Sequence, residues 1–245
     1  MLTPRHHLCR TARSSSRGGF TLVELLVVIG IIAILAGVAL GPITNGIQKA
    51  KQSAGLQQAH SVGLAMYSFA NDNNQLYPDT GTPGIPAGNS KTGAAAAASA
   101  LLAGGYVTDA TIFGLSGDTS ASYVKVTSST NGATTITAAN VSWDFLGNTG
   151  NGVSSTSYPF LPLLWSTITG GGAAPVFTAA AGTAITATPI AKNPFGTSGM
   201  AIFYINNSAA FVTASVGTSG LQVNMVTGPI NLGGAPSTYV VLSAT

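Results

Sequence analysis

The sequence predicts an α+β fold in which a long N-terminal α-helix packs on a C-terminal antiparallel β-sheet. Two features of the 245-residue chain carry this prediction. An apolar run from Phe20 to Ile43 leads without a break into an amphipathic segment of helical periodicity. From Tyr106 onward, short alternating or apolar segments are separated by Gly, Asn, Ser and Pro, which is typical of strands and turns.

Residues 1–19 are predicted to be a basic leader that is cleaved off. They contain four arginines and no acid, whereas the rest of the chain contains five lysines and six acids. The excess positive charge therefore lies in the leader, which indicates a cytoplasmic N-terminus and leaves no basic patch for nucleic acid. The alternatives are an uncleaved anchor and an ordinary signal peptide, although the apolar run is longer than the ~7–15 residues of a signal-peptide core. The arginines are Arg5, Arg10, Arg13 and Arg17.

The run from Phe20 to Ile43 is long enough to cross a membrane. As a helix it spans about 36 Å at ~1.5 Å per residue, against a hydrocarbon layer of ~30 Å. Only Thr21 and Glu24 have polar side chains in it. Because an unpaired charge inside a membrane is costly, Glu24 is a functional candidate. A cut between Gly19 and Phe20 would create an α-amino group four residues before Glu24. That amine, from the same or a neighbouring subunit, could pair with the carboxylate.

The residues around this cut carry a family resemblance. The stretch Gly-Phe-Thr-Leu-Val-Glu-Leu-Leu, residues 19–26, resembles the processing site of type IV prepilins and type II secretion prepseudopilins. The resemblance implies that a membrane peptidase cuts after Gly19 and methylates the new amine of Phe20. It also implies that Glu24, fifth in the mature chain, acts in subunit assembly. Strong similarity covers about residues 17 to 45, and weaker similarity continues to roughly Pro78.

Small residues recur along the membrane segment, residues 20–43. Ala33, Gly37 and Gly41 are spaced four apart and share one helix face. Such a pattern lets helices approach closely in lipid, although Gly is also simply common in membrane helices. Pro42 removes a backbone donor and predicts a kink, or a turn that unwinds when the helix packs into a filament. We expect these four residues to act in assembly, as the resemblance to pilins implies.

Residues 44–72 are predicted to form the amphipathic half of the helix, and residues 73–245 an extracytoplasmic, mainly β domain. The helix should end in the cluster of turn formers at residues 71–74. After a linker at residues 79–92, a short alanine-rich helix is predicted near residues 94–103, stopped by Gly104 and Gly105. This segment is too short and too weakly hydrophobic for a second membrane span.

Five segments are strand candidates, and two short stretches between them are predicted hairpin turns. The last hundred residues contain one formal charge, Lys192, so charge does not protect the sheet edges from pairing with a neighbour. Trp143 and Trp165 are interpreted as core or interface anchors. The candidate strands are residues 122–127, 201–205, 210–214, 221–226 and 239–242, and the turns are Asn206-Asn207 and residues 217–220.

Catalytic, cofactor and metal sites find little support in the sequence. His60 is the only histidine after the leader and is interpreted as a packing or surface residue, because no Ser/His/Asp set can be built around it. The Asn-Asp-Asn-Asn stretch at residues 71–74 offers oxygen ligands for Ca²⁺, but with one acid a helix-ending turn is the better interpretation. We therefore predict no enzyme, no cofactor and no metal.

The resemblance implies a structural subunit of a type IV pilus-like or type II secretion filament. It would be inserted once in the bacterial inner membrane with a cytoplasmic N-terminus and then assembled into a periplasmic or cell-surface filament. Its implied partners are other pilin-like subunits, prepilin peptidase, an inner-membrane assembly platform and membrane lipid, and not nucleic acid. The resemblance covers pilins and pseudopilins, major and minor subunits alike. The alternative is a membrane-anchored extracellular β-rich binding or adhesion module that does not polymerise.

Overall fold

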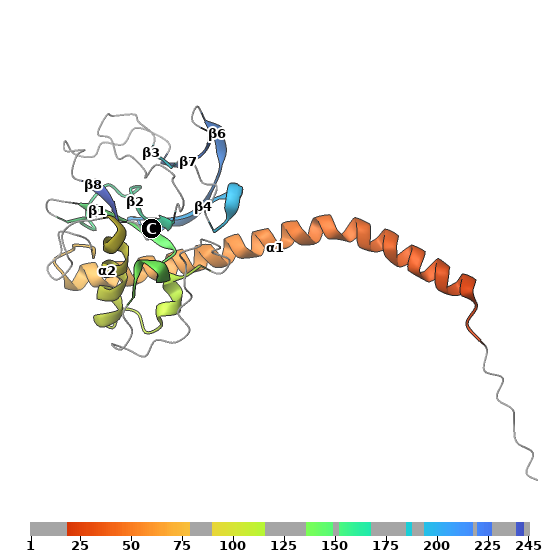
Figure 1. Cartoon of the computed structure of the whole chain (residues 1–245). Coiled ribbons are helices and arrows are strands. Elements are labelled where there is room, and N and C mark those ends of the chain that lie inside the picture. Colours follow the sequence, from red (N-terminus) through yellow and green to blue (C-terminus); the bar gives the residue numbers. More distant parts are fainter. Residues whose placement is uncertain are drawn as a thin grey trace, which may run out of the picture. The chain divides into compact units, whose positions relative to one another are not determined.

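The computed structural model confirms the predicted α+β, pilin-like arrangement, a long N-terminal helix with a C-terminal antiparallel sheet (Figure 1). The chain divides into two compact units, residues 1–46 and residues 47–245. The structure describes residues 19–78, 90–115, 136–148, 152–167, 185–187, 194–217, 220–226 and 239–242.

The long helix α1 runs from Leu22 to Asp72 and remains helical through Pro42. Its predicted end is confirmed by the turn that follows, in which Asn74 and Gln75 have positive φ angles of 54° and 63°. The Gln75 N–H donates to the carbonyl of Ala70 at 2.7 Å. The last carbonyls of the helix thus gain partners, as in helix C-caps. The unwound turn predicted at Pro42 concerns an assembled filament and stays a prediction.

The larger sheet is antiparallel, with its five strands in the order β5-β4-β2-β1-β8. Asp144 of β1 pairs with Trp165 of β2, which pairs with Ile202 of β4. Every residue of β2 is buried, as is all of β1 except its last residue, so the centre of the sheet lies inside the core. The bounds are β1 Trp143–Asn148, β2 Pro162–Ser166, β4 Gly199–Tyr204, β5 Ala209–Thr213 and β8 Tyr239–Leu242.

A smaller antiparallel sheet has the order β3-β7-β6. Its strands are β3 Ile185–Ala187, β7 Gly220–Val226 and β6 Ser215–Gly217. The Tyr204 hydroxyl of β4 donates to the carbonyl of Met225 in β7 at 2.8 Å and so joins the two sheets. Gly217 pairs with Gly220. The central residues of the turn predicted at residues 217–220 lie outside the described residues.

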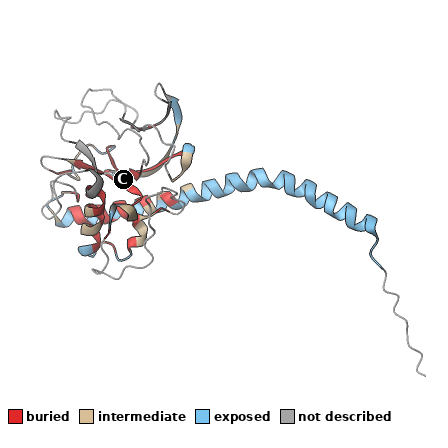
Figure 2. Ribbon diagram, viewed as in Figure 1, coloured by how far each residue is buried: buried red, intermediate tan, exposed pale blue. Residues whose placement is uncertain are grey.

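The second half of α1 packs on the sheet through a glycine. A Cβ built on Gly63 would clash with three ring carbons of Phe203 in β4, so the ring occupies the space that any larger residue would need. The imidazole of His60 meets the same ring edge to face, with ring centroids 5.9 Å apart. Ala59, Val62 and Met66 on the same side of the helix are fully buried (Figure 2). The amphipathic segment therefore forms part of the core of residues 47–245.

Shorter helices complete the described structure. The helix α2, Ser90–Ala103, starts earlier than the sequence predicted, so the last residues of the predicted linker are helical. It contacts β8 and β1. The 3-10 helices are η1 Ala110–Phe113, η2 Ala138–Asn140 and η3 Gly196–Ser198. These three short helices lie in the region after Tyr106, which the sequence predicts to be mainly β.

Four predicted strands are confirmed as β4, β5, β7 and β8, with bounds shifted by two residues or fewer. The turn at Asn206-Asn207 is also confirmed, since Asn207 has φ 61° and its N–H donates to the carbonyl of Tyr204 at 3.0 Å. The strands β1, β2, β3 and β6 were not predicted. All residues of the central strands β1 and β2 except the last residue of β1 are buried, so these strands lack the alternation that marks a half-exposed strand. The strand predicted at residues 122–127 lies outside the described residues.

Candidate processing and assembly site

The peptide bond between Gly19 and Phe20 lies just before the first helical residue, Leu22. Gly19 is exposed, and a Cβ built on it would meet no atom within 4 Å. The side chain of Phe20 is 76% exposed. Among the described residues, the helical hydrogen bonds begin only after this bond.

The helix begins with a capping box formed by Thr21 and Glu24. The Thr21 N–H and hydroxyl donate to Oε2 of Glu24 at 2.9 and 2.7 Å, and the Glu24 N–H donates to the Thr21 hydroxyl at 3.3 Å. The Leu25 N–H donates to the Thr21 carbonyl at 3.2 Å and closes the first turn. The sequence analysis missed this local role of Glu24, although Thr-x-x-Glu before an apolar run is the signature of a capping box.

The same contacts leave half of the Glu24 carboxylate available. Both hydrogen bonds from Thr21 reach Oε2, and within the described residues none reaches Oε1. Glu24 as a residue is exposed. The other oxygen of the carboxylate can therefore accept a hydrogen bond from another molecule while the cap at the start of the helix stays intact.

The small residues predicted to act in assembly lie on an exposed part of α1. Ala33, Gly37 and Gly41 are exposed, and a Cβ on either glycine would meet nothing within 4 Å. Pro42 has no N–H to donate, and the hydroxyl of Thr44 donates to the carbonyl of Gly41 at 2.9 Å. The backbone on this face is thus open to close approach by a second helix.

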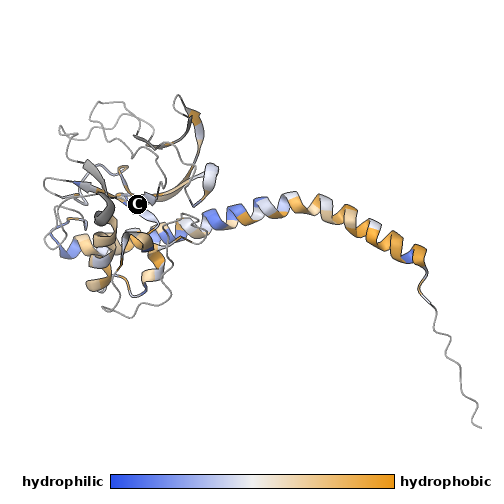
Figure 3. Cartoon of the chain, in the orientation of Figure 1, coloured by the Kyte–Doolittle hydropathy of each residue, from blue (hydrophilic) through white to orange (hydrophobic). Residues whose placement is uncertain are grey.

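The large apolar side chains of the same segment lack partners within the described chain. From Phe20 to Ile43 their exposed fractions range from 45% for Val28 to 78% for Leu22. Figures 2 and 3 show the first half of α1 as both exposed and hydrophobic. By length and composition, α1 is the one described helix that could cross a membrane. Such a continuous apolar surface needs lipid or protein around it.

The remaining candidates from the sequence fall into structural roles. Trp143 and Trp165 lie on β1 and β2 and are fully buried, so they are core anchors and not interface residues. In the stretch considered for calcium, Asp72 accepts from the Tyr106 hydroxyl at 2.9 Å, and the Asn73 amide donates to the carbonyl of Phe69 at 2.8 Å. These contacts are those of a helix-ending turn. No three His, Cys, Asp or Glu side chains gather in the described part of the chain.

Comparison with known proteins gives a match to a family model. The family model called the prokaryotic N-terminal methylation motif matches residues 14–40. No curated protein and no solved structure matches the chain. The match covers the predicted cleavage point, the capping box and most of the exposed apolar segment. Residues 14–40 of this chain therefore match an N-terminal methylation motif of the type that prepilins carry.

Proposed function

We propose that this chain is a structural subunit, pilin or pseudopilin, of a type IV pilus-like or type II secretion filament. The observation that carries the proposal is the exposed apolar half of α1, most of which lies within the matched N-terminal methylation motif. A surface of this kind fits lipid before assembly and the helices of neighbouring subunits after it. The chain would span the bacterial inner membrane once, with its N-terminus in the cytoplasm.

The proposed division of the chain follows from this role. Residues 1–19 form the leader, which prepilin peptidase removes by cutting after Gly19 and whose removal exposes the Phe20 amine for methylation. Residues 20–43 hold the subunit in the membrane and later in the filament. Residues 44–72 attach this segment to the extracytoplasmic domain, residues 73–245. The partners are other pilin-like subunits and an inner-membrane assembly platform.

In the filament, the open Oε1 of Glu24 would accept the Phe20 amine of a neighbouring subunit. Such a pair gains Coulomb energy in a low dielectric but loses hydration, so we expect it to determine register more than total stability. Ala33, Gly37 and Gly41 would let helix backbones approach closely. Pro42 would allow the turn before it to loosen as the helices pack.

Processing is tested by the intact mass of the protein extracted from membranes or sheared from cells, with fragmentation from the N-terminus. A chain that begins at Phe20 and carries one extra methyl group is the expected result. A chain that begins at Met1, or one cut beyond the apolar run, would contradict the proposal. A membrane-anchored or secreted binding module would then be the better interpretation.

Assembly is tested by Glu24→Gln, because this substitution separates the charge from the cap. Glutamine at the same position still completes a capping box, so the helix start is retained while the negative charge is lost. We expect normal membrane insertion and few or disordered filaments. Glu24→Ala, which removes both functions, serves as the comparison. If Glu24→Gln forms normal filaments and Glu24→Ala does not, the cap and not the charge is what assembly requires.

A further inference from the structure

The strand β5 forms one edge of the larger sheet and pairs with β4 alone among the described strands. Its first four residues are half-buried, and Thr213 is exposed. Natural sheet edges usually carry a charge or a proline, because their free backbone groups can pair with another chain. The stretch from Ser208 to Gly217, which contains β5 and β6, has neither. This edge therefore lacks the usual protection against pairing.

The register shows which backbone groups of β5 point away from β4. The Tyr204 N–H donates to the Ser208 carbonyl at 2.9 Å, and the Ala214 N–H donates to the Ser198 carbonyl at 3.2 Å. Both pairs continue the ladder of β4 and β5, in which bonded and non-bonded pairs alternate. Every second residue of β5 thus directs its N–H and its carbonyl outward, and no described residue bonds to these groups. The outward residues are Ala209, Phe211 and Thr213.

Side-chain packing holds this edge in shape. The ring of Phe211 meets that of Phe195 edge to face, with ring centroids 5.3 Å apart. Phe195 in turn fills the space beside Gly55 of α1, where a Cβ would clash with it. The edge strand is therefore anchored to the helix behind it and presents its outward groups in a fixed order.

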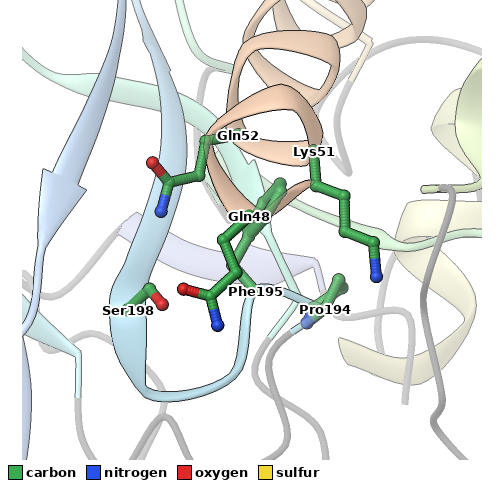
Figure 4. Close-up of a pocket in the computed structure, with 6 residues that line it drawn as sticks. All are labelled: Gln48, Lys51, Gln52, Pro194, Phe195 and Ser198. Atoms are coloured by element: carbon green, nitrogen blue, oxygen red, sulfur yellow. The ribbon is translucent and has the colours of Figure 1, made fainter. Parts of the chain in front are cut away.

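The neighbouring elements limit the free edge to β5. Ser198, which precedes β4, lines a pocket of about 190 Å³ together with Gln48 and Gln52 of α1 (Figure 4). Beyond Thr213 the chain enters β6, where Ser215 already pairs with β7. A partner strand thus has the five residues of β5 to pair with.

A second copy of β5 matches the outward groups. When two β5 strands lie antiparallel about a twofold axis at Phe211, Ala209 of each copy faces Thr213 of the other. The two Phe211 residues face each other. Each outward N–H then meets an outward carbonyl, so the three N–H groups and three carbonyls of each strand are all paired.

Charge favours the same partner. Twofold pairing places each side chain near its own copy, so a charge in β5 would repel itself. β5 contains no charged residue, and the two Phe211 side chains would form an aromatic cross-strand pair, which stabilises antiparallel sheets. An uncharged edge whose donors and acceptors complement themselves therefore favours a second copy of this chain over a charged peptide.

We propose that two copies of this chain associate through β5, which joins their larger sheets into one continuous antiparallel sheet. The contact is twofold, whereas the repeated contact along a helical filament is head-to-tail. The β5 contact therefore acts apart from the contacts that build a filament, between subunits that are unassembled or that lie in adjacent filaments. It can be tested independently of the filament proposal.

The test is oxidative cross-linking of full-length chains in detergent, with Cys9→Ser in each so that the introduced thiol is the one cysteine. In the proposed register, Ala210 of one copy lies opposite Val212 of the other, with Cα atoms about 4.5 Å apart, which suits a disulfide. In chains of one kind, the two thiols lie a further ~6.6 Å apart along the strand. A mixture of Ala210→Cys and Val212→Cys should therefore give about tenfold more cross-linked dimer than either variant alone.

The matched control is a mixture of Ala210→Cys and Val216→Cys. Val216 is 86% exposed but lies outside β5, so random collision favours it and the proposed register excludes it. Cross-linking that is as strong with Val216→Cys as with Val212→Cys would overturn the proposal. In membranes, the added substitution Glu24→Ala should leave the cross-link in place. Its loss would tie the contact to filament assembly and would also overturn the twofold contact.

A further variant tests the backbone hydrogen bonds. Thr213→Pro removes an outward N–H and leaves the bonds to β4 in place. Two N–H groups are lost per dimer, so the dissociation constant, measured by analytical ultracentrifugation in detergent, should rise about tenfold. Thr213→Val keeps the N–H and is the matched control, and unfolding curves check that both variants fold. Equal dissociation constants for the two folded variants would contradict the proposal, and the cross-linking result decides if the proline variant does not fold.

Discussion

The glycines in the two halves of α1 have opposite surroundings. In residues 22–46, Gly30, Gly37 and Gly41 have open space around them, and the apolar side chains between them are exposed. In residues 47–72, which Figure 2 shows as partly buried, the rings of Phe195 and Phe203 occupy the space beside Gly55 and Gly63. Both halves use glycine to let something approach the helix backbone.

The difference lies in where the partner comes from. The second half finds its partners within the same chain, so its glycines belong to folding. The first half has no such partner among the described residues, so we infer that its glycines serve contacts with other molecules. Substitutions in the second half should therefore change the stability of residues 47–245, and those in the first half should change assembly.

The largest expected effect is that of Phe203→Ala. The ring of Phe203 is fully buried between β4 and α1, so its removal leaves a cavity and should lower the free energy of unfolding by about 3–5 kcal/mol. Denaturant unfolding followed by the fluorescence of Trp143 and Trp165, the two tryptophans of the chain, measures this in detergent-solubilised protein. Phe160→Ala is the matched control, since Phe160 is 56% exposed and should cost less than about 1 kcal/mol.

The next effect compares one substitution in the two halves. Gly63→Ala forces the Phe203 ring to move and should lower the free energy of unfolding by about 1–3 kcal/mol, despite the better helix propensity of alanine. Gly37→Ala should leave the same unfolding curve unchanged and instead reduce filament yield, counted by electron microscopy. If Gly63→Ala is neutral, or if Gly37→Ala shifts the unfolding curve, the proposed division between folding and assembly fails.

A smaller effect should appear at alkaline pH. Burial raises the pKa of Tyr77 and of Tyr204 to about 12, and the Tyr204 hydroxyl also donates to Met225. Because the folded state favours the neutral phenol, this stabilisation is complete below the ordinary tyrosine pKa near 10 and is lost as pH rises through 12. The loss should be of the order of 1 kcal/mol per tyrosine after allowance for solvent screening.

The measurement is the free energy of unfolding between pH 8 and 12, compared with that of Tyr204→Phe. The variant lacks the Tyr204 hydroxyl, whose pKa is raised to about 12 in the folded state, and should lose less stability over this range. Identical slopes for the variant and the parent chain would show that Tyr204 does not contribute.

The smallest effect is expected at acid pH from Asp109. Its carboxylate accepts from the N–H and hydroxyl of Thr111 at 2.9 and 2.7 Å, and these bonds lower the pKa of Asp109. A lowered folded-state pKa gives stability that is present above the unfolded value near 4 and lost as pH falls through the folded one. The group is exposed, so we expect less than about 1 kcal/mol.

The control for this prediction is Asp109→Asn, which keeps a capping side chain but cannot ionise. Thermal unfolding at pH 2 to 6 should then show a slightly weaker pH dependence than in the parent chain. An unchanged pH dependence would assign the acid sensitivity to other carboxyl groups.

The sequence best predicted those features of the fold that a strong local pattern marks. The apolar run, the amphipathic continuation and the end of α1 near residue 72 are all written in periodicity and turn residues. The hairpin at Asn206 and Asn207 was equally readable, because Asn tolerates a positive φ. The part of the site that the family model covers, residues 14–40, was also recognisable from the sequence.

The rest depended on contacts between distant residues. The central strand β1 contains the buried Asp144, whose Oδ1 accepts from the Thr167 hydroxyl at 3.0 Å. In the sequence alone, before this partner is known, an acidic residue argues against a buried strand. The contact between Phe203 and Gly63 joins residues that are far apart in the sequence, and no local pattern marks it. The pocket that Gln48 and Gln52 of α1 form with Ser198 of η3 could not be predicted for the same reason, since the two helices lie far apart in the sequence.

Removal of the leader would change the electrical character of the helix end while keeping its hydrogen bonds. The three bonds between Thr21 and Glu24 all lie after the Gly19–Phe20 peptide bond, so the cap outlasts the cut. The cut adds an ammonium group at the end of a helix where the backbone dipoles already leave about half a positive charge. In a processed monomer, the Glu24 carboxylate of the same helix would offset this positive charge only in part, since the ammonium and the helix dipole together exceed one unit of charge. A carboxylate from a second helix would complete the balance, so cleavage would favour association by adding a positive charge and not by uncovering new surface.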